Sequence, residues 1–447
     1  MYISFSDRAR TTDVPSSTPG KTGAKVSATV VALGLVSMLT DISSESVAAI
    51  LPLYLTSVLG LSTIAFGFID GLYQGVSAVV RIAGGYAADR TEQPKWVAFF
   101  GYAISALARI GLLVGTGFGV IAAVVTIDRL GKGVRTAPRD ALITASSLPE
   151  NLGRSFGVHR MLDTIGAAIG PLLAFLVLFF IPSGYNVIFV VSLAFALLGL
   201  VILGLLVPNL SRRPLAATPA GAANAVRAVA VPEVASEVGL EVGPEAPVAR
   251  PRFRWRYLND PRLRRLLLVA GIFGLLTVGD GFIYLVLQAR SSFAAAWFPL
   301  LYVGTNLAFL VCAVPLGRLA DRFGRLRVFI IGHGALLAAY VCAALPTIAA
   351  LATIGCLVLL GIFYAASDGV LAALASQYTP DGSTASGIAA AQTVVALARL
   401  LASVGFGFLW FALGRESAVL IVAALLAVAI PAAALLLRPY LARPRVS

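Results

Sequence analysis

Acidic side chains inside otherwise apolar segments are the residues of this chain most able to do chemistry. Asp41 and Glu45 stand four residues apart, so a helix would place both on one face. Asp70 occupies the next apolar segment, and His159 lies one helical turn before Asp163 in a later one. A carboxylate in an apolar environment must find a cation or water or take up a proton, and histidine titrates near physiological pH. We predict that the group that binds and releases a proton is one of these five residues.

The densest set of charges is a basic stripe in a single predicted helix. Asp128, Lys132, Arg135 and Arg139 follow one another at steps of four, three and four, which places them on one helical face. Lipid could not solvate such a face, so it must line a cavity or a neighbouring helix. We expect Asp128 and Lys132 to neutralise each other in part, which leaves Arg135 to pair with an anionic group. The predicted cavity set is completed by Arg129, Asp280, Asp368 and Arg399.

Each of these charges also has a plainer interpretation. A carboxylate and an arginine can form a fixed ion pair that joins two helices and takes no part in any cycle. For His159, a position near the start of its predicted helix also fits a capping or solvated role. Both interpretations stay open at this point, because spacing along the chain does not separate them.

The composition assigns these charges to a membrane protein. Hydrophobic residues make up 59% and charged residues 12% of the 447 residues, whereas roughly 25% of an average soluble domain is charged. A helical crossing needs about 20 apolar residues, so the chain has room for about a dozen crossings. The cysteines, Cys312, Cys342 and Cys356, lie in apolar segments without metal-ligand spacing. We therefore expect no metal site and no cofactor.

Apolar runs bounded by glycine, proline or charge predict six helices on each side of a polar central stretch. The expected fold class is all-α, with twelve transmembrane helices in two pseudo-symmetric six-helix halves. The span that holds the basic stripe is too charged to pass a simple hydropathy threshold. The predicted spans are 28–58, 63–87, 95–115, 118–145, 154–181, 185–207, 263–289, 293–316, 327–348, 351–377, 386–412 and 416–438.

The regions around these spans predict the orientation of the chain. We expect an N-terminal tail at 1–25, a first half at 26–207, a disordered linker at 208–260, a second half at 261–440 and a short tail at 441–447. Arginine and lysine concentrate on the side of both tails and the linker, so the positive-inside rule makes these three regions cytoplasmic. The formal net charge of +13 then reflects orientation in a multi-pass cytoplasmic membrane protein, and no soluble basic face indicates nucleic-acid binding.

A short charged motif occurs twice, at the matching loop of each predicted half. Each copy has a glycine, then an aspartate and arginine in sequence, then a further basic residue. The copies are Gly85, Asp89, Arg90 and Lys95 in the first half and Gly317, Asp321, Arg322 and Arg325 in the second. A carboxylate at a helix end can meet an arginine or the N-terminus of a neighbouring helix. Anchoring by the positive-inside rule accounts for the basic residues but not for an aspartate at the same place in both copies. We therefore predict that each motif is a latch that holds one conformation and releases in another.

These motifs resemble those of a known family. The two charged copies are similar to the loop motif that the major facilitator superfamily carries between helices two and three and again between helices eight and nine. A glycine and proline pattern resembles the fifth-helix motif of the antiporters of this superfamily, although Ala174 and Phe175 stand where two glycines would close it. The residues of this pattern are Gly157, Gly166, Gly170 and Pro171.

The resemblance implies a monomeric transporter in the lipid bilayer that moves a small-molecule substrate by alternating access of its two halves. The fifth-helix pattern implies export of the solute against an inward flow of protons. Proton-coupled uptake of an anionic small molecule or metal chelate is the alternative, favoured by the basic stripe and the incomplete pattern. A non-transporting membrane sensor or scaffold is the alternative from another class, and the many interior charges argue against it. We expect no enzyme, because no nucleophile, base and orienting group stand together.

Overall fold

The computed structural model describes residues 26–91, 93–148, 151–209, 260–344, 349–379 and 384–441, and for 82–91, 349, 384–386 and 440–441 it describes the backbone alone. These residues form helices joined by short turns, and none of them is in a strand. Helices suit such an apolar chain, because each satisfies its own backbone hydrogen bonds without help from water. The predicted all-α class is confirmed.

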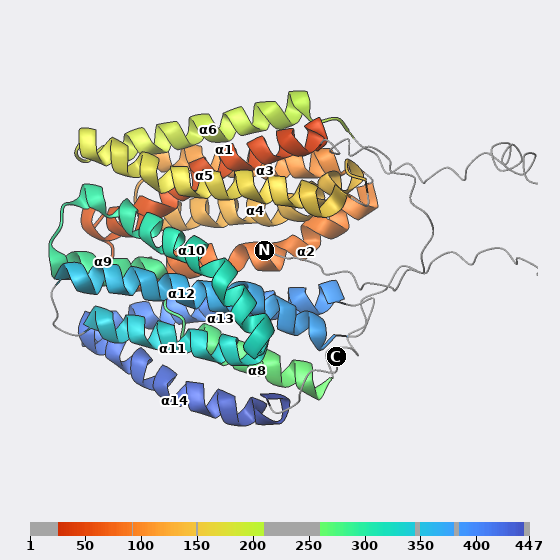
Figure 1. Cartoon of the computed structure of the whole chain (residues 1–447). Helices are drawn as coiled ribbons and strands as arrows, with labels where there is room; N and C mark the ends of the chain where they lie inside the picture. Colours follow the sequence, from red (N-terminus) through yellow and green to blue (C-terminus); the bar gives the residue numbers. More distant parts are fainter. Residues whose placement is uncertain are drawn as a thin grey trace, which may run out of the picture.

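The first half is a bundle of six helices, coloured red to yellow-green in Figure 1. Ser27 caps the first helix by accepting a hydrogen bond from the Thr29 amide, and Pro94 begins the third, where its missing N–H is not needed. The helices are α1 (Ala28–Leu53, continued by the π-helical turn Tyr54–Val58), α2 (Thr63–Thr91), α3 (Pro94–Val114), α4 (Phe118–Ala145), α5 (Leu152–Phe180) and α6 (Tyr185–Leu206).

The second half is a matching bundle, coloured green to blue in Figure 1, and its first span is broken. The predicted span 263–289 consists of two helices, because the chain leaves helical geometry after Leu275 and resumes it at Asp280. The helices are α8 (Pro261–Leu275), α9 (Asp280–Ser291), α10 (Pro299–Phe323, preceded by the 3₁₀ turn Ala295–Trp297), α11 (Arg325–Ala344), α12 (Ala349–Gln377), α13 (Thr384–Leu413) and α14 (Arg415–Leu441).

Eleven segments of the described chain are long and apolar enough to cross a membrane, with α8 and α9 counted as one. The remaining long helix of the twelve, α4, is 28 residues long but carries the basic stripe, as the sequence predicts. Figure 1 places the start of α1, the end of α6, the start of α8 and the end of α14 at the same end of the molecule. We call this the terminal end, and the opposite end, which includes Val58, Thr63 and Leu413, the distal end.

Glycines set how closely the helices of the first half approach one another. A Cβ atom on Gly131 of α4 would lie 2.6 Å from the carbonyl oxygen of Gly101 in α3, so these two backbones are in direct contact. Gly133, on another face of α4, packs in the same way against Ser77 and Val80 of α2. α4 is thus held between two neighbours, and Lys132, Arg135 and Arg139 lie on the side of α4 that these contacts leave open.

Candidate functional site

A cavity of about 470 Å³ lies between the two halves, nearer the terminal end. α1, α4 and α5 supply most of its wall, Arg81 of α2 and Tyr102 of α3 add to it, and α10 closes it from the second half. This volume is typical of a site for a small molecule. The lining residues are Ser37, Thr40, Asp41, Arg81, Tyr102, Lys132, Arg135, Thr136, Arg139, Arg160, Asp163, Thr164, Ala167, Ala168, Val303, Asn306, Leu307, Phe309 and Leu310.

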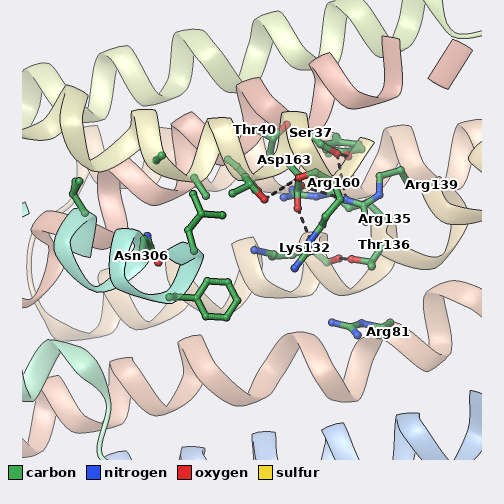
Figure 2. Close-up of a pocket in the computed structure, with 18 of the residues that line it drawn as sticks. Ser37, Thr40, Arg81, Lys132, Arg135, Thr136, Arg139, Arg160, Asp163 and Asn306 are labelled. Atoms are coloured by element: carbon green, nitrogen blue, oxygen red, sulfur yellow. Dashed lines mark hydrogen bonds and ion pairs between the residues drawn. The ribbon is translucent and has the colours of Figure 1, made fainter. Parts of the chain in front are cut away.

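Basic side chains dominate the polar part of this wall. Figure 2 shows Lys132, Arg135 and Arg139 from α4 and Arg160 from α5 around Asp163, with Arg81 approaching from α2. The lining holds five basic residues against two acidic ones, Asp41 and Asp163. With every group in its usual ionised form, the cavity carries a net positive charge and favours an anionic guest.

Three members of the basic stripe line the cavity, but Asp128 does not pair with Lys132. Its carboxylate lies 3.0 Å from the Arg109 guanidinium of α3 and 2.5 Å from that of Arg129, and all three residues are buried. Two arginines hold Asp128 because its side chain points toward α3, whereas Lys132 points into the cavity. The prediction that Asp128 and Lys132 neutralise each other in part is therefore wrong. The charge of Lys132 acts instead on Asp41, a carboxylate of the cavity wall.

Aromatic rings hold the buried guanidinium groups of α4. The guanidinium carbon of Arg129 lies 3.9 Å from the ring centre of Tyr73 in α2. That of Arg135 lies 4.5 Å from the ring centre of Tyr102, and its Nη1 donates a hydrogen bond of 2.9 Å to the Ser105 hydroxyl. Cation–π contact and hydrogen bonding fix these side chains without neutralising them. The positive charge of Arg135 therefore persists in the cavity wall.

The two acidic lining residues face each other from α1 and α5. The carboxyl groups of Asp41 and Asp163 lie within hydrogen-bonding reach, and Lys132 is close enough to act on Asp41 electrostatically. Asp163 also lies 3.3 Å from the Arg160 guanidinium and 4.0 Å from that of Arg139. Two carboxyl groups so close repel each other when both are charged, and one proton between them removes the repulsion.

His159 is buried beside the cavity rather than solvated. Its Nε2 lies 3.0 Å from the Ser37 hydroxyl of α1, which in turn lies 3.5 Å from the Tyr102 hydroxyl and accepts a hydrogen bond of 3.3 Å from Arg139. Only 3% of its surface is exposed. The solvated role that its sequence position suggested is wrong, because α5 packs this part of its surface against α1.

The glycine pattern of α5 serves its contact with α1. A Cβ atom on Gly166 would collide with the backbone of Met38, and one on Gly170 would lie 2.9 Å from the Cβ of Glu45. A Cβ on Gly157 would meet nothing within 4 Å, and Pro171 lies within the helix. The middle of the pattern thus brings Asp163 and Asp41 together, and it places Glu45 against α5.

The predicted charges of the second half form two contacts of their own. The Tyr364 hydroxyl donates a hydrogen bond of 2.7 Å to Asp280 at the start of α9, and Arg399 lies 3.7 Å from Asp368. None of these residues lines the cavity described above. Asp70, a predicted proton site, lies instead at the contact between the halves, where it accepts a hydrogen bond of 2.6 Å from Ser403.

The predicted latch residues lie at the terminal end, in three different situations. Gly85, Asp89 and Arg90 belong to the last turns of α2, of which the backbone alone is described. The Lys95 ammonium donates a hydrogen bond of 2.9 Å to the Gly204 carbonyl near the end of α6.

In the second copy, Arg325 pairs with Asp321 one turn away at 3.2 Å. This ion pair lies within the second half, as the Lys95 hydrogen bond lies within the first. The Arg322 guanidinium lies 5.5 Å from the ring centre of Phe323. A Cβ atom on Gly317 would meet nothing within 4 Å.

Sequence reasoning missed several polar residues of the cavity. Ser37, Tyr102 and Thr136 belong to predicted helices, but their hydroxyl groups gave no sign of a role in the cavity. A hydroxyl in an apolar helix often donates to the backbone of its own helix, as Thr136 does to the Lys132 carbonyl, and then needs no other partner. Asn306 of α10 could have been predicted to line a polar site, since an amide in an apolar span needs a polar partner. Arg160 of α5 was also not among the residues predicted to line the cavity.

Two six-helix halves around a polar central cavity define the architecture of a secondary transporter. The sequence matches the Major Facilitator Superfamily over residues 33–403 and 282–447, and the chain belongs to this family. It is 29% identical over 401 residues to an MFS-type transporter of Methanocaldococcus jannaschii, which covers 86% of this chain and 89% of that one.

Two solved structures share the fold at low identity. The structure of a POT family transporter in complex with 5-aminolevulinic acid has a TM-score of 0.73 and 14% identity, and the alignment covers 93% of this chain and 96% of that one. A bacterial homologue of the human lysosomal transporter Spinster, in an inward-facing and unoccupied conformation, has a TM-score of 0.69 and 15% identity over 94% and 98% of the two chains. This protein is a membrane transporter of the MFS type.

Proposed function

We propose that this transporter moves a small anionic solute together with protons, by alternating access of its two halves. The observation that carries the proposal is the cavity lining, which holds five basic residues around a facing pair of carboxyl groups. In an ordinary membrane with an inward proton gradient, this coupling drives uptake of the solute. The concentration of arginine and lysine at the terminal end supports a cytoplasmic location for that end in the cell membrane.

The facing carboxyl groups of Asp41 and Asp163 are the proposed proton site. A proton added to this pair removes one negative charge and leaves the surrounding cations less neutralised. An anion then binds more tightly, and by thermodynamic reciprocity the bound anion favours protonation by the same factor. Proton and anion therefore load together, which is the condition for symport.

The solute itself bridges the two halves in this proposal. Lys132 and Arg135 of the first half offer positive charge to its anionic group, while Asn306 of α10 offers an amide from the second half. A cavity of about 470 Å³ limits the solute to a small molecule. The structural likeness to a transporter with bound 5-aminolevulinic acid, a small carboxylic acid, agrees with this size.

Export by proton antiport is the second candidate function. The glycine and proline pattern of α5, with Gly166 and Gly170 pressed against α1, is the feature that favours it. In antiport the solute and the proton compete for one site, so the preferred solute would be a cation that meets Asp41 and Asp163 directly. The sign of the solute charge thus separates the two candidates.

A vesicle experiment tests the choice without knowledge of the orientation of the protein. We would reconstitute the full chain in vesicles with a trapped pH-sensitive dye and add small carboxylates, phosphate esters, neutral amides and amines one at a time. With symport, inward flow of an anion carries protons and acidifies the interior. With antiport, inward flow of the solute expels protons and makes the interior alkaline. Protein-free vesicles correct for acids and amines that cross the lipid unaided.

The expected result is acidification that depends on the protein and occurs with anions alone. Alkalinisation by an amine would overturn the proposal in favour of antiport. Solute entry with no change of internal pH would reject proton coupling for either direction. Absence of protein-dependent flux for any solute of the set, with intact folding, would favour the non-transporting sensor or scaffold.

A further inference from the structure

A carboxylate lies directly on the contact between the two halves, away from the cavity. Asp70 of α2 accepts a hydrogen bond of 2.6 Å from the Ser403 hydroxyl of α13, and the Gln74 side chain, one turn along α2, lies close to the same carboxylate. Ser403 is completely buried. A hydrogen bond to an ionised carboxylate is roughly twice as strong as one between neutral groups.

The break in the seventh span lies against the same carboxylate. A Cβ atom on Gly279, the residue that precedes α9, would collide with the Oδ2 atom of Asp70. Glycine is therefore the residue that lets the carboxylate reach the N-terminal end of α9, a helix of 12 residues. The unpaired amides and the dipole at a helix N-terminus stabilise a negative charge placed there. Asp70 thus joins α2 to two separate elements of the second half.

Close backbone packing surrounds this contact on the distal side. The Thr63 hydroxyl donates a hydrogen bond of 3.1 Å to the Gly407 carbonyl, again from α2 to α13. A Cβ on Gly407 would lie 3.2 Å from the Gly67 Cα, so the two helices touch at their glycines. The Phe66 and Phe282 rings pack edge to face with their centres 4.5 Å apart. The halves are in close contact here. Nearer the terminal end the cavity opens between α10 and the first half, although Arg81 of α2 still donates a hydrogen bond of 3.3 Å to the Gln392 side chain of α13.

We propose that Asp70 is a clamp that holds the distal end of the two halves together, through Ser403 and the N-terminal end of α9, and that must let go when this end opens. In this role Asp70 is a positioning residue and touches no solute. The charged contact adds to the packing and the Thr63 hydrogen bond at this end, so its loss should shift the balance between the two states towards the open distal end. The proposal is independent of the identity of the solute and of the coupling ion.

Distance measurements between spin labels at each end of the molecule test the clamp. The distal pair is Val58→Cys with Leu413→Cys and the terminal pair is Leu148→Cys with Phe323→Cys, and all four positions are at least half exposed. The three natural cysteines are first replaced by alanine. Asp70→Ala removes the charge and the acceptor, Asp70→Asn removes the charge alone, and Ser403→Ala removes the donor.

The clamp predicts a graded opening of the distal end. Asp70→Ala should raise the ratio of long to short distal distances about tenfold, as expected for loss of one partly buried charge-assisted hydrogen bond. Asp70→Asn and Ser403→Ala should each raise it less. The terminal pair should shorten in the same samples, because the two ends open alternately.

The control is Ser192→Ala, which removes a hydroxyl that lies 2.8 Å from Ser43 within the first half. This variant should leave both distances unchanged. Unchanged distal distances in Asp70→Ala, or an equal shift in Ser192→Ala, would overturn the proposal. If Asp70→Ala fails to fold, Ser403→Ala alone provides the test. A distal distance in Ser403→Ala equal to that of the protein without this substitution would then overturn the proposal.

Discussion

The role of a charged residue in this transporter depends on the side chains around it more than on its residue type. Asp128 and Asp163 are both aspartates in the middle of charged helices. Two buried arginines neutralise Asp128, whereas Asp163 faces Asp41 at the edge of a cavity. The first arrangement is a fixed ion pair that joins α3 to α4. The second leaves a carboxyl pair whose charge changes when one proton binds, which is what coupling to a proton gradient requires.

Neutralising Asp163 should uncouple solute from proton. In Asp163→Asn the repulsion between the two carboxylates is gone, so Asp41 keeps its charge beside Lys132 and no longer needs to take up a proton. The solute should then still move down its own gradient while the change of internal pH falls at least tenfold. The measurement is solute flux and internal pH in the same vesicles. Glu416→Gln serves as the control, because this carboxylate is exposed on α14, pairs with Arg415 and lies outside the cavity lining. An unchanged ratio of protons to solute in Asp163→Asn would show that another group carries the proton.

Lys132 should contribute to solute binding in proportion to the charge of the solute. Lys132→Gln removes a cation that lines the cavity, and loss of a charged contact of this kind costs about 1.5–3 kcal/mol, or roughly tenfold to a hundredfold in affinity. The KM for an anionic solute should rise by that factor, with little effect on a neutral analogue. Arg154→Gln, which removes an exposed cation from the same region of the chain, should leave KM unchanged. An equal loss for the neutral analogue would mean that Lys132 only shapes the cavity.

At the scale of elements, the fit of α5 against α1 places the two carboxyl groups. The same substitution at two glycines of α5 should therefore have opposite outcomes. In Gly166→Ala the new methyl group collides with the Met38 backbone, and such overpacking costs on the order of 1–3 kcal/mol. In Gly157→Ala the methyl group meets nothing within 4 Å, and alanine favours a helix by about 1 kcal/mol.

The thermal midpoint of the purified protein in detergent measures the difference between these variants. Gly166→Ala should lower the midpoint and reduce transport, whereas Gly157→Ala should keep both at or above the original values. Equal midpoints would mean that α5 moves away from α1 at little cost and does not fix the position of Asp163.

At the scale of the whole molecule, the two charged motifs and the Asp70 clamp lie at opposite ends. An alternating-access transporter needs a contact at each end that is made in one state and broken in the other. In the described structure the halves meet at the distal end, around Asp70 and Ser403, while the Asp321 and Arg325 pair stays within one half. The predicted latch at the terminal end would then engage in the other state.

Asp89→Asn should slow the cycle without harm to the fold. The charge it removes is needed only where the terminal end closes, so membrane insertion and abundance should stay normal while transport falls strongly. Asp321→Asn should do the same at the matching position of the second half. Quantified flux per inserted molecule is the measurement. Normal flux in both variants would mean that the motif is no latch and only orients the chain in the membrane through its basic residues.

The sequence by itself determined the class, the long apolar spans and the charged helix α4, which is absent from the segments apolar enough to cross a membrane. Apolar runs of a fixed length are a local property, since each helix satisfies its own backbone hydrogen bonds. The break in the seventh span between Leu275 and Asp280 escaped prediction. A single glycine, Gly279, does not by itself predict a break, and the backbone groups that the break frees are satisfied by a residue far away in the sequence: the Tyr340 hydroxyl of α11 accepts a hydrogen bond of 2.8 Å from the Val278 amide and donates one of 3.1 Å to the Leu276 carbonyl.

Only the tertiary structure decided which charges meet. The periodicity of α4 placed Asp128 and Lys132 on one stripe, yet a stripe is wide enough for one side chain to turn toward α3 and the other into the cavity. Likewise, no spacing in the sequence could pair Asp41 with Asp163 or Asp70 with Ser403. Coulombic and hydrogen-bonding energies depend on distances of a few ångströms between helices, and those distances are set by glycine contacts distributed over the whole chain.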